Sequence, residues 1–283
     1  MEIKFEHVDF VYEKYNCTSK VVFRDLNLTF KPGKVYGIVG KCGCGKTTLL
    51  QLINVLSIPT KGKIKIGDYL VLSNRVPENV NELRSQIGFV CQNSFEQFIH
   101  QTVYEELLFN LSYHNYNTKN PIKRISDALK MVGLDDSYIN RNLVHLSTGE
   151  KRRVAIASIL IYNPKIILLD GLTVGLNSVD KDSLIKLFKL LKNKYNKTII
   201  IASHDMDFLH RIVDDIYVID KQNIILSGDK YSVFKKGKEL KKIGIKVPRL
   251  IGFSNLVLEK KKIKIGYRDD INDLIKDIYR FVK

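Results

Sequence analysis

The segment from residue 40 to residue 47 constrains this chain more than any other part of it. It fits the pattern G-x-x-x-x-G-K-[ST], with Gly40, Lys41, Cys42, Gly43, Cys44, Gly45, Lys46 and Thr47 at the eight positions. Residues 34–39 before it indicate a short buried strand, and residues 48–53 after it indicate the start of a helix. A glycine loop between a strand and a helix predicts a phosphate-binding loop rather than a chance glycine-rich turn.

Such a loop binds a polyphosphate mainly through its backbone. Glycines let successive N–H groups turn inward around the phosphates, and the N-terminus of the following helix adds a favourable dipole. We expect Lys46 to reach the β- and γ-phosphates and the Thr47 hydroxyl to ligate Mg²⁺, with Thr48 next to them at the start of the helix. The chain is therefore predicted to bind a nucleoside triphosphate together with Mg²⁺.

The length and hydropathy of the chain limit its class. Its 283 residues are enough for one large domain, or for one domain with an appendage. The most apolar region, residues 154–169, is interrupted by Asn163, Pro164 and Lys165, so we expect no transmembrane helix. Residues 1–6 have neither the basic start nor the apolar core of a signal peptide, so we expect a cytoplasmic protein.

The four cysteines, Cys17, Cys42, Cys44 and Cys91, show no metal-binding spacing. Two of them lie inside the phosphate loop, where a Cys-x-Cys pair is too tight for a structural zinc site. Reduced cytosolic thiols are therefore expected, with a redox-sensitive loop as the less favoured alternative.

The formal net charge of +16 is unevenly distributed. Residues 221–283 contain 17 lysines and arginines but only 7 acidic residues. A solvated basic face and a functional basic surface explain this excess equally well. A nucleic acid or the anionic leaflet of a membrane would be the partner of a functional surface.

The order of the predicted elements indicates an α/β fold. Apolar and polar residues alternate in two early segments, which predicts two antiparallel strands with a polar loop at about residues 16–19 between them. Continuous apolar runs, which are typical of buried parallel strands, alternate with helical patterns later in the chain. The expected strands are 3–12, 20–30, 62–67, 86–90, 165–170 and 197–204, and the expected helical stretches are 95–161, with polar breaks at 115–120 and 133–136, and 180–194.

Five further elements follow in the order typical of an ABC-type ATPase. Tyr12 lies in the first strand pair, and Gln92 follows the strand at residues 86–90. Leu-Ser-Thr-Gly-Glu at 146–150 resembles the LSGGQ signature, the run at 166–170 resembles a Walker B strand, and His204 resembles the switch histidine. Each element alone has an ordinary structural explanation, but their order and spacing together resemble this family over nearly the whole chain.

The resemblance implies a P-loop NTPase fold with an antiparallel β subdomain, a helical signature subdomain at about residues 95–161 and a small C-terminal appendage. It implies a cassette over residues 1–235 and a lysine-rich appendage of weak periodicity over 236–283. It implies ATP and Mg²⁺ as cofactors. The implied roles are adenine stacking by Tyr12, Mg²⁺ binding by Thr47, Gln92 and Asp170, catalytic contacts by Gln92 and His204, and binding of a partner's nucleotide by Ser147 and Gly149.

Shorter segments resemble the ATP-binding subunits of energy-coupling-factor transporters. These are residues 92–98 with 102–106, residues 149–157, and residues 203–207. The resemblance implies a head-to-tail dimer with a second ABC ATPase, beneath a transmembrane coupling protein that drives a substrate-binding membrane subunit for a micronutrient. It places the chain peripherally on the cytoplasmic face of the membrane, and no nucleic acid is expected as a partner.

Three departures from the family pattern point to an asymmetric motor. Gly171 stands where the family has the glutamate that polarises the attacking water, and Thr148 and Asn177 replace a signature glycine and an aspartate. Loss of a positioned general base costs about 10²–10⁴-fold in rate. We therefore expect ATP binding with weak hydrolysis at this site and a catalytically intact partner. Gly171→Glu should raise the rate, provided that Leu172 and Asn177 do not misplace the new carboxylate. A non-hydrolytic paralogue and a soluble ABC protein acting on nucleic acid or the ribosome are the alternatives.

Overall fold

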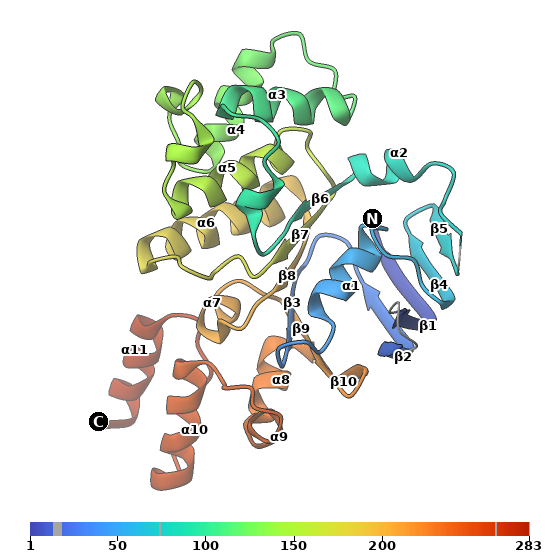
Figure 1. The fold of residues 1–283 in the computed structure, drawn as a ribbon. Coiled ribbons are helices and arrows are strands. Elements are labelled where there is room, and N and C mark those ends of the chain that lie inside the picture. The colour runs from blue at the N-terminus through green and yellow to red at the C-terminus, as the bar shows by residue number, and fades with distance from the viewer. Residues whose placement is uncertain (14–18, 74, 264, 283) are drawn as a thin grey trace.

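A computed structural model describes residues 1–13, 19–73, 75–263 and 265–282, arranged around two β-sheets (Figure 1). Cys17 and most of the predicted polar loop at 16–19 lie outside the described residues. The first sheet has the order β2-β1-β4-β5, and every pairing in it is antiparallel. Its strands are β1 (Ile3–Tyr12), β2 (Lys20–Phe30), β4 (Lys61–Ile66) and β5 (Tyr69–Leu72). The predicted antiparallel subdomain is confirmed.

The second sheet has the order β10-β9-β3-β8-β7-β6 and is parallel except for its β9–β10 edge pair. All residues of β3, β7 and β8 are buried, as the continuous apolar runs predict for strands covered on both faces. The strands are β3 (Val35–Gly40), β6 (Ile87–Val90), β7 (Ile166–Asp170), β8 (Thr198–Ala202), β9 (Asp215–Asp220) and β10 (Asn223–Asp229).

The order of this sheet brings three functional segments together. β8 lies between β3 and β7, and all three strands run in the same direction. The phosphate loop follows β3, Asp170 ends β7 and His204 follows β8. The carboxyl ends of parallel strands share one edge of a sheet, so residues far apart in the sequence meet there.

Two hydrophobic clusters cover the two faces of the parallel sheet. Helix α1 (Lys46–Ile53) packs with the first sheet and with Ile38 and Leu168 of the second, so its start is fixed between the sheets. The opposite face of the second sheet packs against the helical region. That region contains α3 (Val103–Tyr113), α4 (Pro121–Met131), α5 (Thr148–Leu160) and α6 (Ser178–Tyr195), and α2 (Val80–Ser85) precedes β6. The polar breaks predicted at 115–120 and 133–136 coincide with the ends of α3 and α4.

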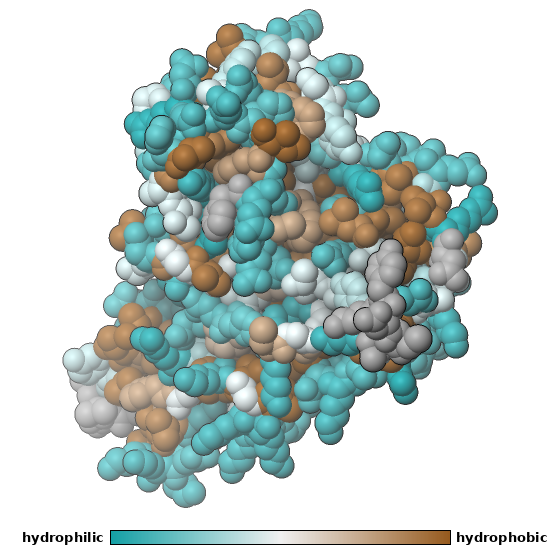
Figure 2. All heavy atoms as spheres, in the orientation of Figure 1, coloured by the Kyte–Doolittle hydropathy of each residue, from teal (hydrophilic) through white to brown (hydrophobic). Residues whose placement is uncertain are grey.

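The C-terminal part of the chain forms helices that its weak periodicity did not predict. They are α8 (Lys230–Lys235), α9 (Gly237–Lys242), α10 (Arg249–Lys261) and α11 (Ile271–Val282), and they follow the short helix α7 (Met206–His210) and strands β9 and β10. They lie at the end of the molecule opposite α3 (Figure 1). Figure 2 shows apolar surface over α10 and α11, where Phe253, Leu256 and Ile271 are exposed. Among the described residues, no helix is both long and apolar enough to span a bilayer.

Candidate nucleotide-binding site

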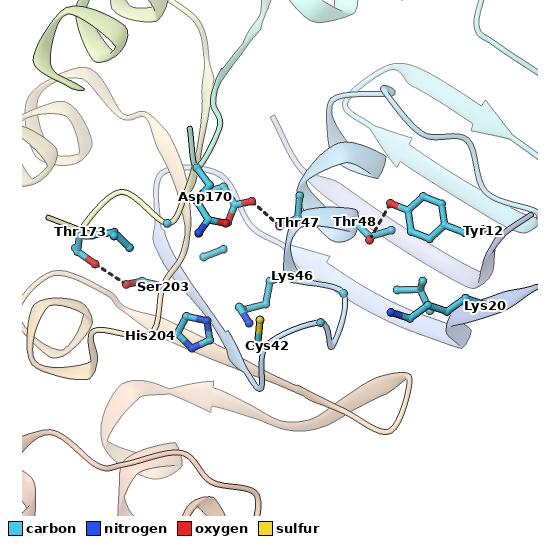
Figure 3. A pocket seen from close by; sticks show the side chains of 17 residues that line it. Tyr12, Lys20, Cys42, Lys46, Thr47, Thr48, Asp170, Thr173, Ser203 and His204 are labelled. Carbon is cyan, nitrogen blue, oxygen red and sulfur yellow. Dashed lines mark hydrogen bonds between the residues drawn. The ribbon is translucent and has the colours of Figure 1, made fainter. Parts of the chain in front are cut away.

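A cavity of about 250 Å³ opens at the edge of the parallel sheet where β3, β7 and β8 end (Figure 3). Most of the predicted site residues line it, although they come from segments spread over nearly 200 positions of the sequence. The predicted members are Tyr12, Cys42, Gly43, Gly45, Lys46, Thr47, Thr48, Gln92, Asp170 and His204, together with Gly171. The loop residues Gly40, Lys41 and Cys44 adjoin the cavity without lining it.

Backbone conformation and close packing explain why glycine occupies three positions of the loop. Gly43 and Gly45 have φ angles of +73° and +110°, which side-chain-bearing residues rarely adopt. A Cβ atom on Gly40 would lie 2.5 Å from Cys44 Sγ, and one on Gly45 would lie 2.7 Å from Val22 Cγ1. A Cβ atom on Gly43 would meet nothing within 4 Å. The loop therefore leaves open space beside Gly43, and this space suits a phosphate chain.

Lys46 lies inside this loop. Its side chain is only 8% exposed, and Nζ donates to the carbonyl oxygens of Gly40 at 3.0 Å and Lys41 at 2.8 Å. The ammonium group thus has two neutral acceptors and a third donor position. This arrangement presents a fixed positive charge where phosphates would enter.

Thr47 and Asp170 form the oxygen pair that Mg²⁺ chemistry requires. The Thr47 hydroxyl donates to Asp170 Oδ2 at 2.6 Å, and the aspartate is only 5% exposed. Burial raises the pKa of Asp170, while the bond from Thr47 and the charge of Lys46 act in the opposite direction. A hydroxyl and a carboxylate are hard oxygen ligands of the kind that Mg²⁺ prefers, so these residues fit the ion.

Gln92 and His204 line the same cavity from two other loops. Both are exposed at its mouth. Figure 3 shows His204 beside Lys46. Burial and the nearby Lys46 lower the pKa of His204, and Asp170 partly offsets this effect. A neutral imidazole retains one ring N–H donor that can face a phosphate oxygen.

Tyr12 is held at the far end of the cavity by its hydroxyl. That hydroxyl shares a 3.1 Å hydrogen bond with Thr48 Oγ1 and donates to Gln51 Oε1 at 3.1 Å. The ring also packs edge-on against Phe10, with 4.8 Å between centroids. Hydrogen bonds thus fix the predicted stacking surface for adenine to α1. The Thr48 side chain both bonds to Tyr12 and lines the cavity.

The backbone at Gly171 bears on the gain in rate expected from Gly171→Glu. Gly171 has a φ of +57°, and a Cβ atom there would lie 2.9 Å from Gln92 Cγ. Its N–H donates to the carbonyl oxygen of Ala202 at 2.9 Å, which fixes this conformation. A glutamate at position 171 would strain the backbone and crowd Gln92, so a simple gain in rate from Gly171→Glu is not what this geometry predicts.

Ser147 and Gly149 are the predicted site residues that do not join the cavity. Ser147 caps α5 in a capping box, in which its hydroxyl accepts from the N–H of Glu150 and its own N–H donates to that side chain. Ser147 is exposed. A separate molecule could therefore reach it, as a site shared across a dimer requires.

Helix α5, which begins in the signature segment, is also bonded to the loop after β7. Arg152 is 4% exposed, and its Nη1 donates to the carbonyl oxygen of Leu172 at 2.7 Å and to that of Val174. Arg153 pairs with Asp180 near the start of α6. These contacts connect Ser147 to the loop that begins at Gly171.

Several lining residues were not predicted from the sequence. Thr173 and Ser203 share a 3.0 Å hydrogen bond beneath the cavity, and both are buried. Lys20 lies directly opposite Tyr12 in the β1–β2 pairing, which brings its side chain to the cavity. Only a correct prediction of this strand register could have identified Lys20 from the sequence. The remaining unpredicted lining residues are Val22, Val174 and Ala202.

A family model described as "ABC transporter" matches residues 23–174, which is more than half of the chain. The energy-coupling factor transporter ATP-binding protein EcfA2 of Caldanaerobacter subterraneus subsp. tengcongensis is 34% identical over 96% of this chain and 93% of the relative. EcfA3 of Oenococcus oeni is 34% identical over 94% of this chain and 91% of the relative. This chain is an ABC transporter ATP-binding protein of the energy-coupling factor family.

Solved structures agree with this membership. The chain is similar to cbiO1 from Clostridium perfringens, described as part of the ABC transporter complex cbiONQ, with a TM-score of 0.72 at 29% identity over 89% of this chain and 98% of the other. It is also similar to the ATP-binding cassette MJ0796, solved as a dimer bound to ADP and Pi, with a TM-score of 0.73 at 27% identity over 80% of this chain and 98% of the other. The predicted fold of this energy-coupling factor family member, a P-loop ABC ATPase, is confirmed.

Proposed function

We propose that this chain is the ATP-binding motor subunit of an energy-coupling-factor transporter for micronutrient uptake, with a nucleotide site that binds ATP firmly and hydrolyses it weakly. The observation that carries this proposal is the cavity in which Lys46, Thr47 and Asp170 meet while Gly171 replaces the expected glutamate. The relatives named for such transporters support the transport role.

Within this site, each residue has a role that follows from its position. Lys46 neutralises the β- and γ-phosphates, and Tyr12 provides a flat surface for the base. Thr47, Asp170 and Gln92 would hold Mg²⁺, which stabilises charge on the phosphates when it is bound. His204 donates a hydrogen bond towards the terminal phosphate. A glutamate at position 171 would supply a carboxylate to take a proton from water, and glycine has no side chain to do so.

The exposed Ser147 and the half-buried Gly149 support a second ABC ATPase as the immediate partner. In a head-to-tail heterodimer, they would contact a nucleotide bound by the partner's phosphate loop. The partner's site would then carry most of the hydrolysis, and this chain would contribute the segment that closes it. Arg152 would couple the two sites, since it links α5 to the loop after Gly171.

The segment at residues 92–97 is the proposed contact with a transmembrane coupling protein, which in turn drives a substrate-binding membrane subunit. The cassette of residues 1–235 would thus lie against the cytoplasmic face of the membrane, with the appendage of residues 236–283 attached to it. No nucleic acid is needed as a partner in this arrangement.

Co-purification from membranes tests the transport role. The chain should be recovered with a second ABC ATPase and a polytopic membrane protein, identified by mass spectrometry. A cysteine at Phe98 should cross-link to cytoplasmic helices of the membrane protein, and a cysteine at the remote Leu258 should not. Recovery with ribosomes or nucleic acid would support the alternative soluble role, and recovery alone in the soluble fraction would support a decayed paralogue.

A further inference from the structure

Helix α7 follows His204 directly and connects the nucleotide cavity to the C-terminal helices. Asp205 caps it by accepting from the N–H of Phe208 at 3.0 Å, and it also pairs with Lys181 at 2.7 Å. Since α7 has only five residues, contacts with neighbouring elements must hold it in place. Only the N-cap residue Asp205 separates His204 from α7, so a shift of α7 would move the His204 loop.

One anchor of α7 is the start of α10. Asp207 Oδ1 accepts from the backbone N–H of Arg249 at 2.7 Å, and Asp207 Oδ2 lies 3.2 Å from Arg249 Nε. The residue at the N-cap position of α10 is Pro248, which offers no side-chain cap. Asp207 therefore supplies the negative charge that a helix N-terminus favours, from a different element.

The second anchor is at the other end of α7. Lys230 donates to the carbonyl oxygen of His210 at 2.9 Å and pairs with Asp269, which precedes α11. Tyr231 also donates to Asp269, at 2.6 Å. The His210 ring is only 1% exposed, and its Nε2, with no hydrogen-bond partner in the described part of the chain, lies 3.7 Å from Asp269 Oδ1.

We propose that Asp207 and Asp269 are positioning residues, through which the C-terminal helices hold α7 and thereby hold His204 against the terminal phosphate of bound ATP. The two anchored positions, 207 and 210, are one helical turn apart, and their partners lie at the start of α10 and in the segment before α11. This inference rests on the proposed function in one respect, namely that His204 faces the γ-phosphate. It assigns to the C-terminal helices an effect on the nucleotide site.

Comparison of ATP with ADP tests this inference, because only ATP carries the γ-phosphate. Affinities of both nucleotides with Mg²⁺ are measured by calorimetry on the full chain carrying Asp207→Ala, Asp269→Ala or His204→Ala. Each variant should bind ATP about fivefold or more weakly and ADP with unchanged affinity. Asp207→Ala combined with His204→Ala should lose no more ATP affinity than His204→Ala alone.

Two controls keep the result specific. Asp273→Ala removes an acidic residue of α11 that pairs with Lys276 of the same helix, so it should leave both affinities unchanged. Asp207→Asn keeps an oxygen acceptor for the Arg249 N–H and should retain most of the ATP affinity. If Asp269→Ala does not fold, the Asp207 series alone decides the outcome.

Three outcomes would overturn the inference. ATP and ADP affinities could fall together, which would mean general damage to the site. ATP affinity could stay unchanged in the Asp207 and Asp269 variants. In the double variant, the loss of ATP affinity from Asp207→Ala could add to the loss from His204→Ala. A failure of the proposed transport role is distinguishable, because it would appear in the co-purification and not in these affinities.

Discussion

A Cβ atom on Gly171 would lie 2.9 Å from Cγ of Gln92, at a backbone φ of +57°. Both values favour glycine over any residue with a side chain at this position. The bond from the Gly171 N–H to Ala202 keeps this geometry in place. The hydrogen bond and the crowding by Gln92 therefore both oppose a larger residue at position 171.

Introducing a glutamate at position 171 is therefore not expected to raise the turnover of ATP. Gly171→Glu should destabilise the fold by about 1–2 kcal/mol, because a left-handed conformation is unfavourable for this residue. Turnover by the isolated chain should stay within about twofold of the parent, since the new carboxylate would be directed towards Gln92. Thermal unfolding and steady-state phosphate release measure the two effects.

Gly171→Asn is the matched control for this prediction. Asparagine adopts positive φ angles more readily than glutamate, so it should cost less stability while adding a Cβ atom at the same place. A rise in turnover of tenfold or more with Gly171→Glu would show that the loop rearranges, and the account of a locked site would be wrong.

Lys46 is expected to be indispensable for nucleotide binding. Lys46→Ala removes a buried ammonium group that bonds to two carbonyl oxygens of the loop and whose third N–H would contact a phosphate, so the charge that faces the phosphates is lost. Calorimetry should detect no Mg-ATP binding. Lys41→Ala changes an exposed lysine of the same loop and should bind ATP within a few-fold of the parent. Unchanged affinity in Lys46→Ala would remove the basis for the phosphate-loop assignment.

Ser147 should matter for the partner's site and not for this chain's own site. Ser147→Arg places a bulky cation where the partner's γ-phosphate would dock. The isolated variant should bind ATP as the parent does, whereas the assembled heterodimer should lose at least about tenfold in turnover. Normal turnover in the assembly would argue against a shared site that uses this segment.

The stability of the chain should depend on pH through His114. Its ring stacks on Tyr162 with 3.7 Å between centroids, and burial lowers its pKa to about 4. The unfolded chain takes up a proton near pH 6.5 and the folded chain only near pH 4, so this contribution to stability is present above pH 6.5 and is lost as the pH falls to about 4. After allowance for solvent screening, the loss is on the order of 1–2 kcal/mol.

Chemical denaturation at a series of pH values measures this loss, with His114→Gln as the comparison. The variant cannot titrate, so the difference between its free energy of unfolding and that of the parent should change across this range. A constant difference between the two proteins would show that His114 does not titrate as described.

The sequence predicted the parts of this molecule that depend on local pattern and fixed spacing. Continuous apolar runs predicted the fully buried strands β3, β7 and β8, whereas β9 was not predicted. The glycine spacing predicted the loop around Lys46. The order of motifs also gave the meeting of Thr47 and Asp170, since strand ends of a parallel sheet share one edge.

Other features depended on information that a pattern does not contain. The φ angle of Gly171 goes with its hydrogen bond to Ala202, which the sequence does not contain, so the sequence could suggest only a lost carboxylate. Lys20 and Thr173 reach the cavity through strand register and a buried hydroxyl pair. The helices after residue 235 are fixed by contacts such as that between Asp207 and Arg249, which join residues about 40 positions apart.

The central claim is that this chain's own site retains ATP without hydrolysing it efficiently. The most direct test is a single-turnover measurement with radiolabelled Mg-ATP on the isolated chain, after calorimetry has confirmed binding. The account predicts bound ATP that is released intact, with turnover about 10²–10⁴-fold below that of the assembled heterodimer. Rapid turnover by the isolated chain would show that another residue activates water at this site, and it would contradict the asymmetric motor.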